Sequence, residues 1–240
     1  MFKTIAITGF LTGGVGNAHR QGFTLAEVLI TLGIIGVVAA MTLPALINQT
    51  HGKELETGLK KAYTVLQAAY NKMTYDEGQI VNNTNYPAHT FMPKFKTYFK
   101  ISKDCNFESC ESDFTDEEGT NRVSQNYKTY NNKKMRNSLL DDGQVFVSDG
   151  MFIMVENMTG GKLLLISIDV NGYNKKPNRW GHDLFTFQIT DNGKLLPMGA
   201  KGTSYDSVNN CSSTSTSTTN GIGCTYKALT DKNYFRNLPK

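Results

Sequence analysis

The most pronounced pattern in the sequence is an apolar run near the N-terminus. The run VLITLGIIGVVAAMTLPALI covers residues 28–47 without a charged side chain. At a rise of about 1.5 Å per residue this run forms a helix of roughly 30 Å, the thickness of the hydrocarbon core of a bilayer. Lys3 and Arg20 precede it, and positive charge on that side favours a cytoplasmic N-terminus. The pattern predicts a single membrane span with the C-terminal bulk of the chain outside the cytoplasm.

After this run the apolar residues adopt helical spacing. They recur every three or four positions, at Leu55, Leu59, Ala62, Leu66, Ala69 and Met73. This spacing places one apolar stripe along a helix, and Glu77-Gly78 ends the pattern with a residue that favours helix termination. We expect one helix over about 23–76, with its second half packed on a folded domain.

From Leu139 onward the pattern becomes that of β-strands. Short β-favouring runs are separated by dipeptides that accept positive φ and so favour hairpin turns. The runs are Gln144–Ser148, Met151–Glu156, Lys162–Ile168, Leu184–Thr190 and Lys194–Leu196, and the dipeptides are Asp149-Gly150, Gly160-Gly161, Asn171-Gly172 and Asn192-Gly193. The sequence therefore predicts an antiparallel meander laid on the long helix, an α+β fold.

The remaining segments carry weaker patterns. Residues 79–140 are polar and indicate only a short helix over 93–100. Residues 203–220 are rich in Ser, Thr and Asn, and we expect them to form an exposed loop.

Several positions around the apolar run do not suit an ordinary membrane anchor. Glu27 places a carboxylate at the membrane edge, where an unpaired charge costs at least a few kcal/mol. Gly22-Phe23 places a small residue just before the run, on the cytoplasmic side where signal peptidase does not act. Pro44 removes a backbone hydrogen bond late in the helix. Together these positions indicate a specialised segment.

The stretch Gly-Phe-Thr-Leu-Ala-Glu at 22–27, followed by the apolar helix, resembles the prepilin cleavage and methylation motif. Type IV pilins and the pseudopilins of type II secretion share this motif. The resemblance implies that a membrane-embedded peptidase cuts after Gly22 and methylates Phe23. It also implies that Glu27 neutralises the N-terminal amine of a neighbouring subunit during assembly, and that Gly36 and Pro44 loosen the helix.

The resemblance implies a division of the chain into three parts. A leader covers 1–22, an N-terminal helix covers 23–76 with its span at 28–47, and a globular head covers 77–240. The implied function is that of a structural subunit of a type II secretion pseudopilus or a type IV pilus. Its implied partners are other pilin or pseudopilin subunits, the prepilin peptidase and the inner membrane, with the head in the periplasm or on the cell surface.

Two alternatives stay open from the sequence. The first, from another class of protein, is a single-span anchored protein whose head binds a ligand or calcium outside the cytoplasm. The second concerns the leader, which is longer and more apolar than the short basic leader usual in the family. It could be a Sec signal cleaved after Ala18, because Gly16-Asn17-Ala18 has the small-x-small form.

The four cysteines fall into two pairs of close neighbours, Cys105 with Cys110 and Cys211 with Cys224. No C-x-x-C spacing and no nearby histidine indicates a metal site. In an oxidising compartment two local disulfides are expected, and of the three connectivities this pairing closes the shortest loops. Free thiols are the alternative if the head stays in the cytoplasm.

The best candidate binding site is a loop that begins with Asp169-Val170-Asn171-Gly172. Asp169 and Asn171 place two side-chain oxygens on the same side of a tight turn, as at the start of a calcium loop, and Asp183 is the candidate for a third. The run D-x-N-G…P-N…W-G-x-D-x-F also resembles the C-terminal loop of pseudopilins, some of which bind calcium there. The alternative is a hairpin loop capped by Asx turns, without an ion.

Other functional classes find little support. The formal net charge of +4 is spread without a basic block, so no stripe for nucleic acid is present. The sequence contains no G-x-S-x-G, H-E-x-x-H or P-loop motif. His182 beside Asp183 is expected to be an exposed loop pair. We predict no enzymatic activity.

Overall fold

A computed structural model describes residues 23–239 except 108–109, 111–125 and 158–162. The chain divides into two compact units, Met1–Leu46 and Ile47–Lys240. Helix α1 (Leu25–Glu77) contributes residues to both units. The predicted leader, including Gly22, lies outside the described residues.

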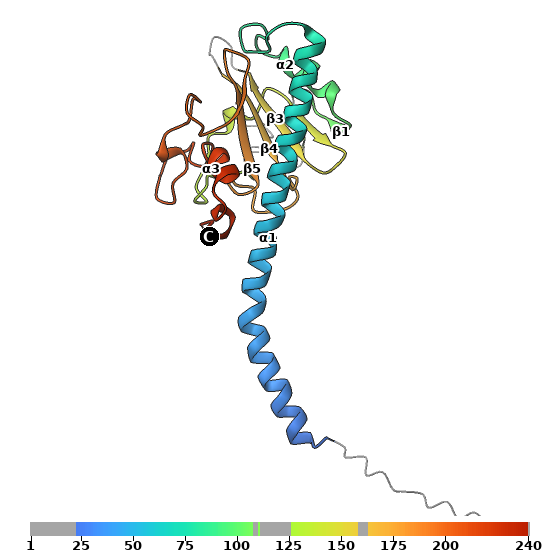
Figure 1. Cartoon of the computed structure of the whole chain (residues 1–240), viewed down its shortest axis with the longest axis vertical. Helices are drawn as coiled ribbons and strands as arrows, with labels where there is room; N and C mark the ends of the chain where they lie inside the picture. The colour runs from blue at the N-terminus through green and yellow to red at the C-terminus, as the bar shows by residue number, and fades with distance from the viewer. Residues whose placement is uncertain (1–22, 108–109, 111–125, 158–162, 240) are drawn as a thin grey trace, which may run out of the picture. The chain divides into compact units, whose positions relative to one another are not determined.

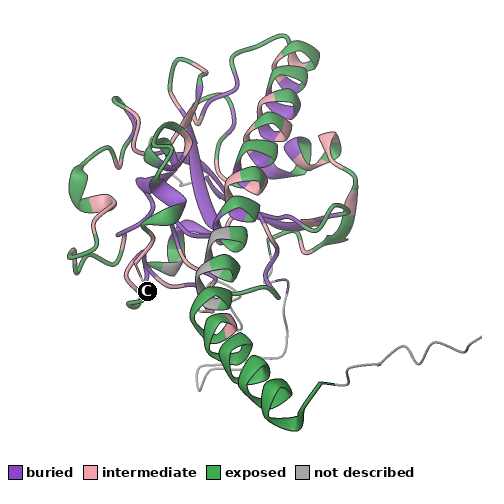
Figure 2. Cartoon of the chain, turned by 60° about the horizontal axis from the view of Figure 1, so that its bottom comes forward, coloured by how far each residue is buried: buried purple, intermediate pink, exposed green. Residues whose placement is uncertain are grey.

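In the first unit the described residues form the N-terminal part of α1. Its stretch Leu25–Leu43 is long and apolar enough to cross a membrane, although a signal sequence would pass the same test. No residue of this stretch is buried within the chain, as the green N-terminal turns of the helix in Figure 2 show. These side chains are therefore left uncovered by the described part of the chain.

The second unit is built on a six-stranded antiparallel sheet in the order β1-β2-β3-β4-β5-β6. The strands are β1 (Ile101–Asp104), β2 (Gln144–Val147), β3 (Phe152–Asn157), β4 (Leu164–Asp169), β5 (Leu184–Ile189) and β6 (Leu195–Pro197). The predicted α+β class and the meander from β2 to β6 are confirmed. Strand β1 was not predicted, because three of its four residues are exposed and no apolar alternation marks it.

One face of the sheet packs against the part of α1 that follows Ile47 (Figure 1). The predicted apolar stripe from Leu55 to Met73 is buried and shares one core with the inward side chains of β3, β4 and β5. Tyr63 stacks on Phe187 with 5.4 Å between ring centroids. The helix ends where predicted, because Gly78 has φ +61, a conformation that glycine adopts without a Cβ clash.

The opposite face of the sheet is covered by loops instead of a helix. Successive residues of a strand point to opposite faces, so Phe152, Met154 and Leu165 turn away from α1 and join a second core. The largest side chains added by the loops are Tyr127 and Trp180, both fully buried. This second core determines the environment of the polar groups on the same face.

Short helices and two disulfides complete the second unit. The helices are α2 (Phe91–Phe95), η1 (Lys96–Tyr98), η3 (Asn137–Leu139), η4 (Val208–Asn210), α3 (Cys224–Thr230) and η5 (Tyr234–Arg236). The expected helix over 93–100 is present but begins earlier and is split into α2 and η1. The disulfides Cys105–Cys110 and Cys211–Cys224 form as predicted.

Candidate functional site

The first candidate site is the start of α1. Phe23, the residue expected to become the mature N-terminus, is 88% exposed. Thr24 and Glu27 form a reciprocal capping box. Glu27 Oε2 accepts hydrogen bonds from the Thr24 backbone N–H at 2.8 Å and from the Thr24 hydroxyl at 2.9 Å. The Glu27 backbone N–H donates to Thr24 Oγ1 at 3.2 Å.

The capping box is a role of Glu27 that was not predicted from the sequence. Its signal was present, because Thr24-Leu-Ala-Glu27 has the T-x-x-E spacing that starts helices. Both hydrogen bonds to the carboxylate end on Oε2, and among the described residues none reaches Oε1. The capping box therefore leaves Oε1 without a hydrogen bond from the described residues.

The two positions expected to loosen the helix lie within α1. A side chain at Gly36 would meet nothing within 4 Å, so packing within the chain does not require a glycine there. The side chain of Pro44 is outside the described part of the structure. Loosening of the helix at these positions stays a prediction.

The second candidate site is the loop between β4 and β5. Asp169, the last residue of β4, is fully buried. Its Oδ1 accepts from the backbone N–H of Asn171 at 3.2 Å and of Gly172 at 2.9 Å, an Asx turn. The Tyr127 hydroxyl donates to its Oδ2 at 2.6 Å. Tyr127 lies far away in the sequence, and no local pattern could have indicated it.

Asp183 closes the same loop from its other end. The backbone N–H groups of Asn178 and Arg179 each donate to its carboxylate at 2.7 Å. Like Asp169, Asp183 is fully buried. The structure thus places Asp169, Asn171 and Asp183 in one loop, in which the two buried carboxylates organise the backbone.

The electrostatics of this loop are unfavourable for two ionised carboxylates. Burial, and next the charge of Asp183, raises the pKa of Asp169 to about 8. Burial also raises the pKa of Asp183 to about 6, against the hydrogen bonds from Arg179 and Asn178. Two buried acids that repel each other are stabilised by a shared proton or by a cation.

Two amide oxygens in the loop are also unsatisfied. Oδ1 of Asn171 and Oδ1 of Asn178 are buried and have no hydrogen-bond partner among the described residues. Buried polar atoms nearly always have a partner, so a water molecule or an ion is the expected partner of each of these oxygens. Carboxylate and amide oxygens are the donors that calcium prefers, so the chemical type of these oxygens fits that ion.

The expectation that His182 and Asp183 form an exposed pair is wrong. His182 is buried, and its Nε2 lies 2.9 Å from the backbone oxygen of Tyr130. Burial lowers the pKa of His182 to about 4. The pair is buried because loops from several parts of the chain cover this face of the sheet, a packing that local polarity does not indicate.

Comparison with known proteins supports the first site. Residues 17–43 match the family model of the prokaryotic N-terminal methylation motif. The chain therefore carries the prepilin-type motif of type IV pilins and pseudopilins. No curated protein and no solved structure matches the chain.

Proposed function

We propose that the chain is a structural subunit of a type IV pilus or a type II secretion pseudopilus, processed between Gly22 and Phe23. The observation that carries this proposal is the first part of α1. Its stretch Leu25–Leu43 is apolar, unburied within the chain and contains one charged residue, Glu27. The match of residues 17–43 to the methylation motif supports the same function.

An apolar helix of this length needs surroundings that the chain itself does not supply. Before assembly the inner membrane provides them, and in a filament the corresponding helices of other subunits provide them. In either setting a single carboxylate is costly unless a positive charge pairs with it. We propose that the N-terminal amine of Phe23 in a neighbouring subunit is that charge.

The location of the head outside the cytoplasm belongs to the same proposal. Lys3 and Arg20 precede the span and favour a cytoplasmic N-terminus. Two disulfides in the second unit are typical of a protein that folds in an oxidising compartment. Both observations support a head that crosses the inner membrane and functions in the periplasm or on the surface.

N-terminal sequencing and a measurement of the intact mass test the processing step. The full chain is expressed with and without a prepilin peptidase, and the expected product begins with N-methylated Phe23. A Gly22→Val variant should stay unprocessed, while the control Ala18→Leu should be processed normally. A product that begins with His19, produced without the peptidase and lost in Ala18→Leu, would support the Sec signal and overturn the proposal.

We further infer that the loop between β4 and β5 binds calcium. Asp169, Asn171 and Asp183 would hold the ion, and Asn178 offers a further amide oxygen in the same loop. The observation that favours this function is the pair of buried amide oxygens without a partner. A bound cation supplies positive charge for two buried carboxylates, and the loop residues hold the hairpin end in place around it.

Isothermal titration calorimetry of the full chain in detergent, stripped with a chelator, tests calcium binding at this loop. Asp169→Asn keeps the size of the side chain but removes its charge, and should lose the heat of this site. Asp191→Asn is the matched control, because Asp191 is exposed and lies outside the loop. Equal binding by the wild type and Asp169→Asn would rule the loop out.

A further inference from the structure

A second group of acids lies elsewhere on the loop-covered face of the sheet. Asp141, Asp142 and Glu156 each place one carboxylate oxygen so that the three oxygens lie within 4.8 Å of one another. Asp141 and Asp142 precede β2, and Glu156 lies in β3. Two hydrogen bonds from backbone N–H groups hold the segments together. The Asp142 N–H donates to the backbone oxygen of Val155 at 2.9 Å, and the Asn157 N–H donates to the Asp142 side chain at Oδ2, at 2.8 Å.

Glu156 is the unusual member of this acidic cluster. Its side chain turns to the same face as Phe152 and Met154, toward the second core, and it is 4% exposed. Its Oε2 is buried and has no hydrogen-bond partner among the described residues. A buried carboxylate oxygen without a partner is expensive, so an independent feature of the cluster indicates a missing ligand.

The two aspartates of the cluster act on the carboxyl group of Glu156. Burial, and then the charges of Asp142 and Asp141, raise the pKa of Glu156 to about 8, while Arg136 acts in the opposite direction. A contact with the Asp141 carboxyl raises this pKa further, since a hydrogen bond there requires a proton on one of the two acids.

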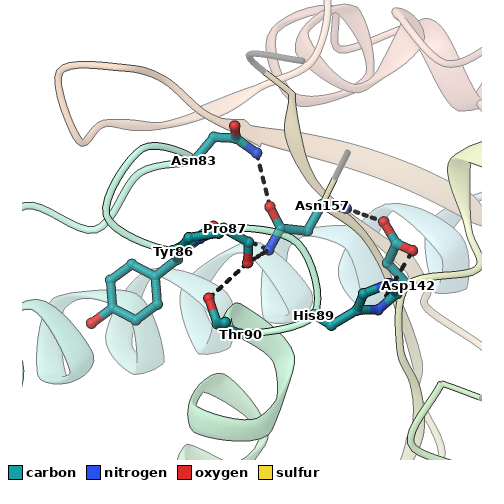
Figure 3. A network of polar contacts seen from close by, with 7 residues as sticks. All are labelled: Asn83, Tyr86, Pro87, His89, Thr90, Asp142 and Asn157. Carbon is teal, nitrogen blue, oxygen red and sulfur yellow. Dashed lines mark hydrogen bonds and ion pairs between the residues drawn. The ribbon is translucent and has the colours of Figure 1, made fainter. Parts of the chain in front are cut away.

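Asp142 lies near the imidazole ring of His89. His89 Nδ1 lies 4.0 Å from Asp142 Oδ1, and the His89 side chain is 57% exposed (Figure 3). Burial, and to a lesser extent the charge of Asp141, raises the pKa of Asp142 despite His89. His89 and Arg136 are both exposed, so water weakens their interaction with the three acids.

The acidic cluster is distinct from the loop at Asp169. In the ladder between β3 and β4, Glu156 pairs with Leu165, whereas Asp169 pairs with Phe152. Glu156 and Phe152 are four residues apart in β3, which corresponds to roughly 13 Å along a strand. One ion therefore cannot serve both groups.

We propose that Asp141, Asp142 and Glu156 bind a hard divalent cation, calcium or magnesium, at the end of β3. Three carboxylates supply the oxygen ligands that such ions take, and water completes their coordination on the partly exposed side of Asp141 and Asp142. The ion links the segment that precedes β2 with strand β3.

The same ion stabilises a second connection next to the cluster. Asn157, which holds Asp142 through its backbone, donates from its side chain to Pro87 O at 2.9 Å and accepts from Asn83 Nδ2 at 2.8 Å. Figure 3 shows these contacts from the loop at 83–90 meeting at Asn157, beside Asp142. A cation at the cluster therefore supports the connection between α1 and α2.

Calorimetry of the full chain in detergent tests this site. After chelation, calcium chloride and magnesium chloride are titrated separately into the wild type, Glu156→Gln and Glu54→Gln. Glu156→Gln should bind one ion fewer than the wild type. Glu54→Gln, which removes the same charge from an exposed position of α1, should bind as the wild type does. An unchanged stoichiometry in Glu156→Gln overturns the proposal.

Thermal unfolding shows whether Glu156→Gln is folded. In chelator this variant should be at least as stable as the wild type, because it lacks a buried ionisable group among like charges. At an ion concentration 100-fold above Kd, the wild type should unfold about 5–10 °C higher through this site, and Glu156→Gln should lack that increment. If about 10 mM calcium or magnesium raises the unfolding temperature of the wild type and of Glu156→Gln equally, the proposal is wrong. Calcium binding by Asp169→Asn tests the loop between β4 and β5 separately, since that variant retains the acidic cluster.

Discussion

Thr24 and Glu27 cap α1 for each other, with the Thr24 hydroxyl 2.9 Å from Glu27 Oε2 and the Glu27 backbone N–H 3.2 Å from Thr24 Oγ1. Glu27 thus acts within its own subunit, by starting the helix, in addition to the proposed pairing with a neighbouring amine. A glutamine can replace glutamate in a capping box, but it cannot neutralise a positive charge. The two roles can therefore be separated by substitution.

The first prediction concerns filament assembly. Glu27→Gln keeps the cap and removes the charge, so it should be processed but should fail to enter filaments. Thr24→Ala weakens the cap and keeps the charge, so assembly should persist at a reduced level. Electron microscopy and immunoblotting of sheared filaments from cells that carry each variant measure the outcome.

Two results would contradict this interpretation of Glu27. If Glu27→Gln assembles as well as the wild type, the charge has no partner in the filament and only the helix start matters. The second result is that the cells form no filaments, while Glu27→Ala and Glu27→Gln both leave the localisation of the chain and ligand binding by its head intact. The anchored binding protein would then be the better description.

A second prediction uses two leucines of the same helix. Leu66 is fully buried against the sheet, whereas Leu29 is 62% exposed within the chain. Leu66→Ala should lower the free energy of unfolding of the second unit by about 2–5 kcal/mol, through lost burial and a cavity. Leu29→Ala should change it by less than about 0.5 kcal/mol. Fluorescence of the single tryptophan, Trp180, which is buried, follows unfolding in denaturant. A loss from Leu29→Ala as large as that from Leu66→Ala would contradict the packing described here.

A third prediction concerns pH in the presence of chelator. The pKa of Asp169 is about 8 and that of Glu156 is also about 8, above their ordinary values, so the folded chain holds these protons more tightly than the unfolded chain. Their contribution to stability is complete below about pH 4 and is lost as the pH rises through 8. The pKa of His182 is about 4 instead of 6.5, so folding favours its neutral form. The contribution of His182 to stability therefore has the opposite pH dependence: it is complete above pH 6.5 and is lost as the pH falls.

Above pH 6.5 the two acids therefore dominate this part of the pH dependence. The unfolding temperature in chelator should fall between pH 6.5 and 8, and calcium should reduce the fall because a bound cation favours the ionised carboxylates. Asp169→Asn and Glu156→Gln should each make the profile flatter. A wild-type profile that is flat or rises over this range in chelator would contradict the burial of ionisable acids at these two positions.

The parts of the molecule that could be predicted from the sequence are those whose signal is local. The stripe from Leu55 to Met73 repeats with the helical period, and the strands from β2 to β6 are β-favouring runs separated by turn dipeptides, so these elements could be predicted from neighbouring residues alone. The residues from Gly22 to Glu27 are consecutive, so their motif can be recognised without knowledge of the fold. Strand β1 lies at an exposed sheet edge, where no alternation is required.

The missed features depend on contacts between distant segments. Glu156 meets Asp141 and Asp142 only through the alignment of β3 with the segment before β2. His182 is buried because the segment containing Tyr130 covers it. Neither arrangement has a local signature, since the polarity of a loop residue does not reveal which loop will pack over it.

The last prediction compares the two disulfides. Cys211–Cys224 closes a loop with a sequence separation of 13, and Cys105–Cys110 one with a separation of 5. Loop-closure entropy assigns about 3 kcal/mol to the longer loop and about 2 kcal/mol to the shorter. The location of the two disulfides in the fold should widen this difference in stabilisation. Cys224 begins α3, where Thr225 Oγ1 accepts a hydrogen bond from the backbone N–H of Thr186 in β5 at 2.9 Å, whereas Cys105 follows the exposed edge strand β1.

The paired variants Cys211→Ala/Cys224→Ala and Cys105→Ala/Cys110→Ala test this order in the same denaturation assay. The first pair should lose more stability than the second, and reduction of the wild type should lower its stability at least as far as the first pair does. Cys224 packs in the core between α1 and the sheet, so loss of its tether should loosen α3 against β5 before the sheet itself unfolds. A larger loss from the Cys105/Cys110 pair would mean that the segment beside β1, and not α3, controls unfolding of the second unit.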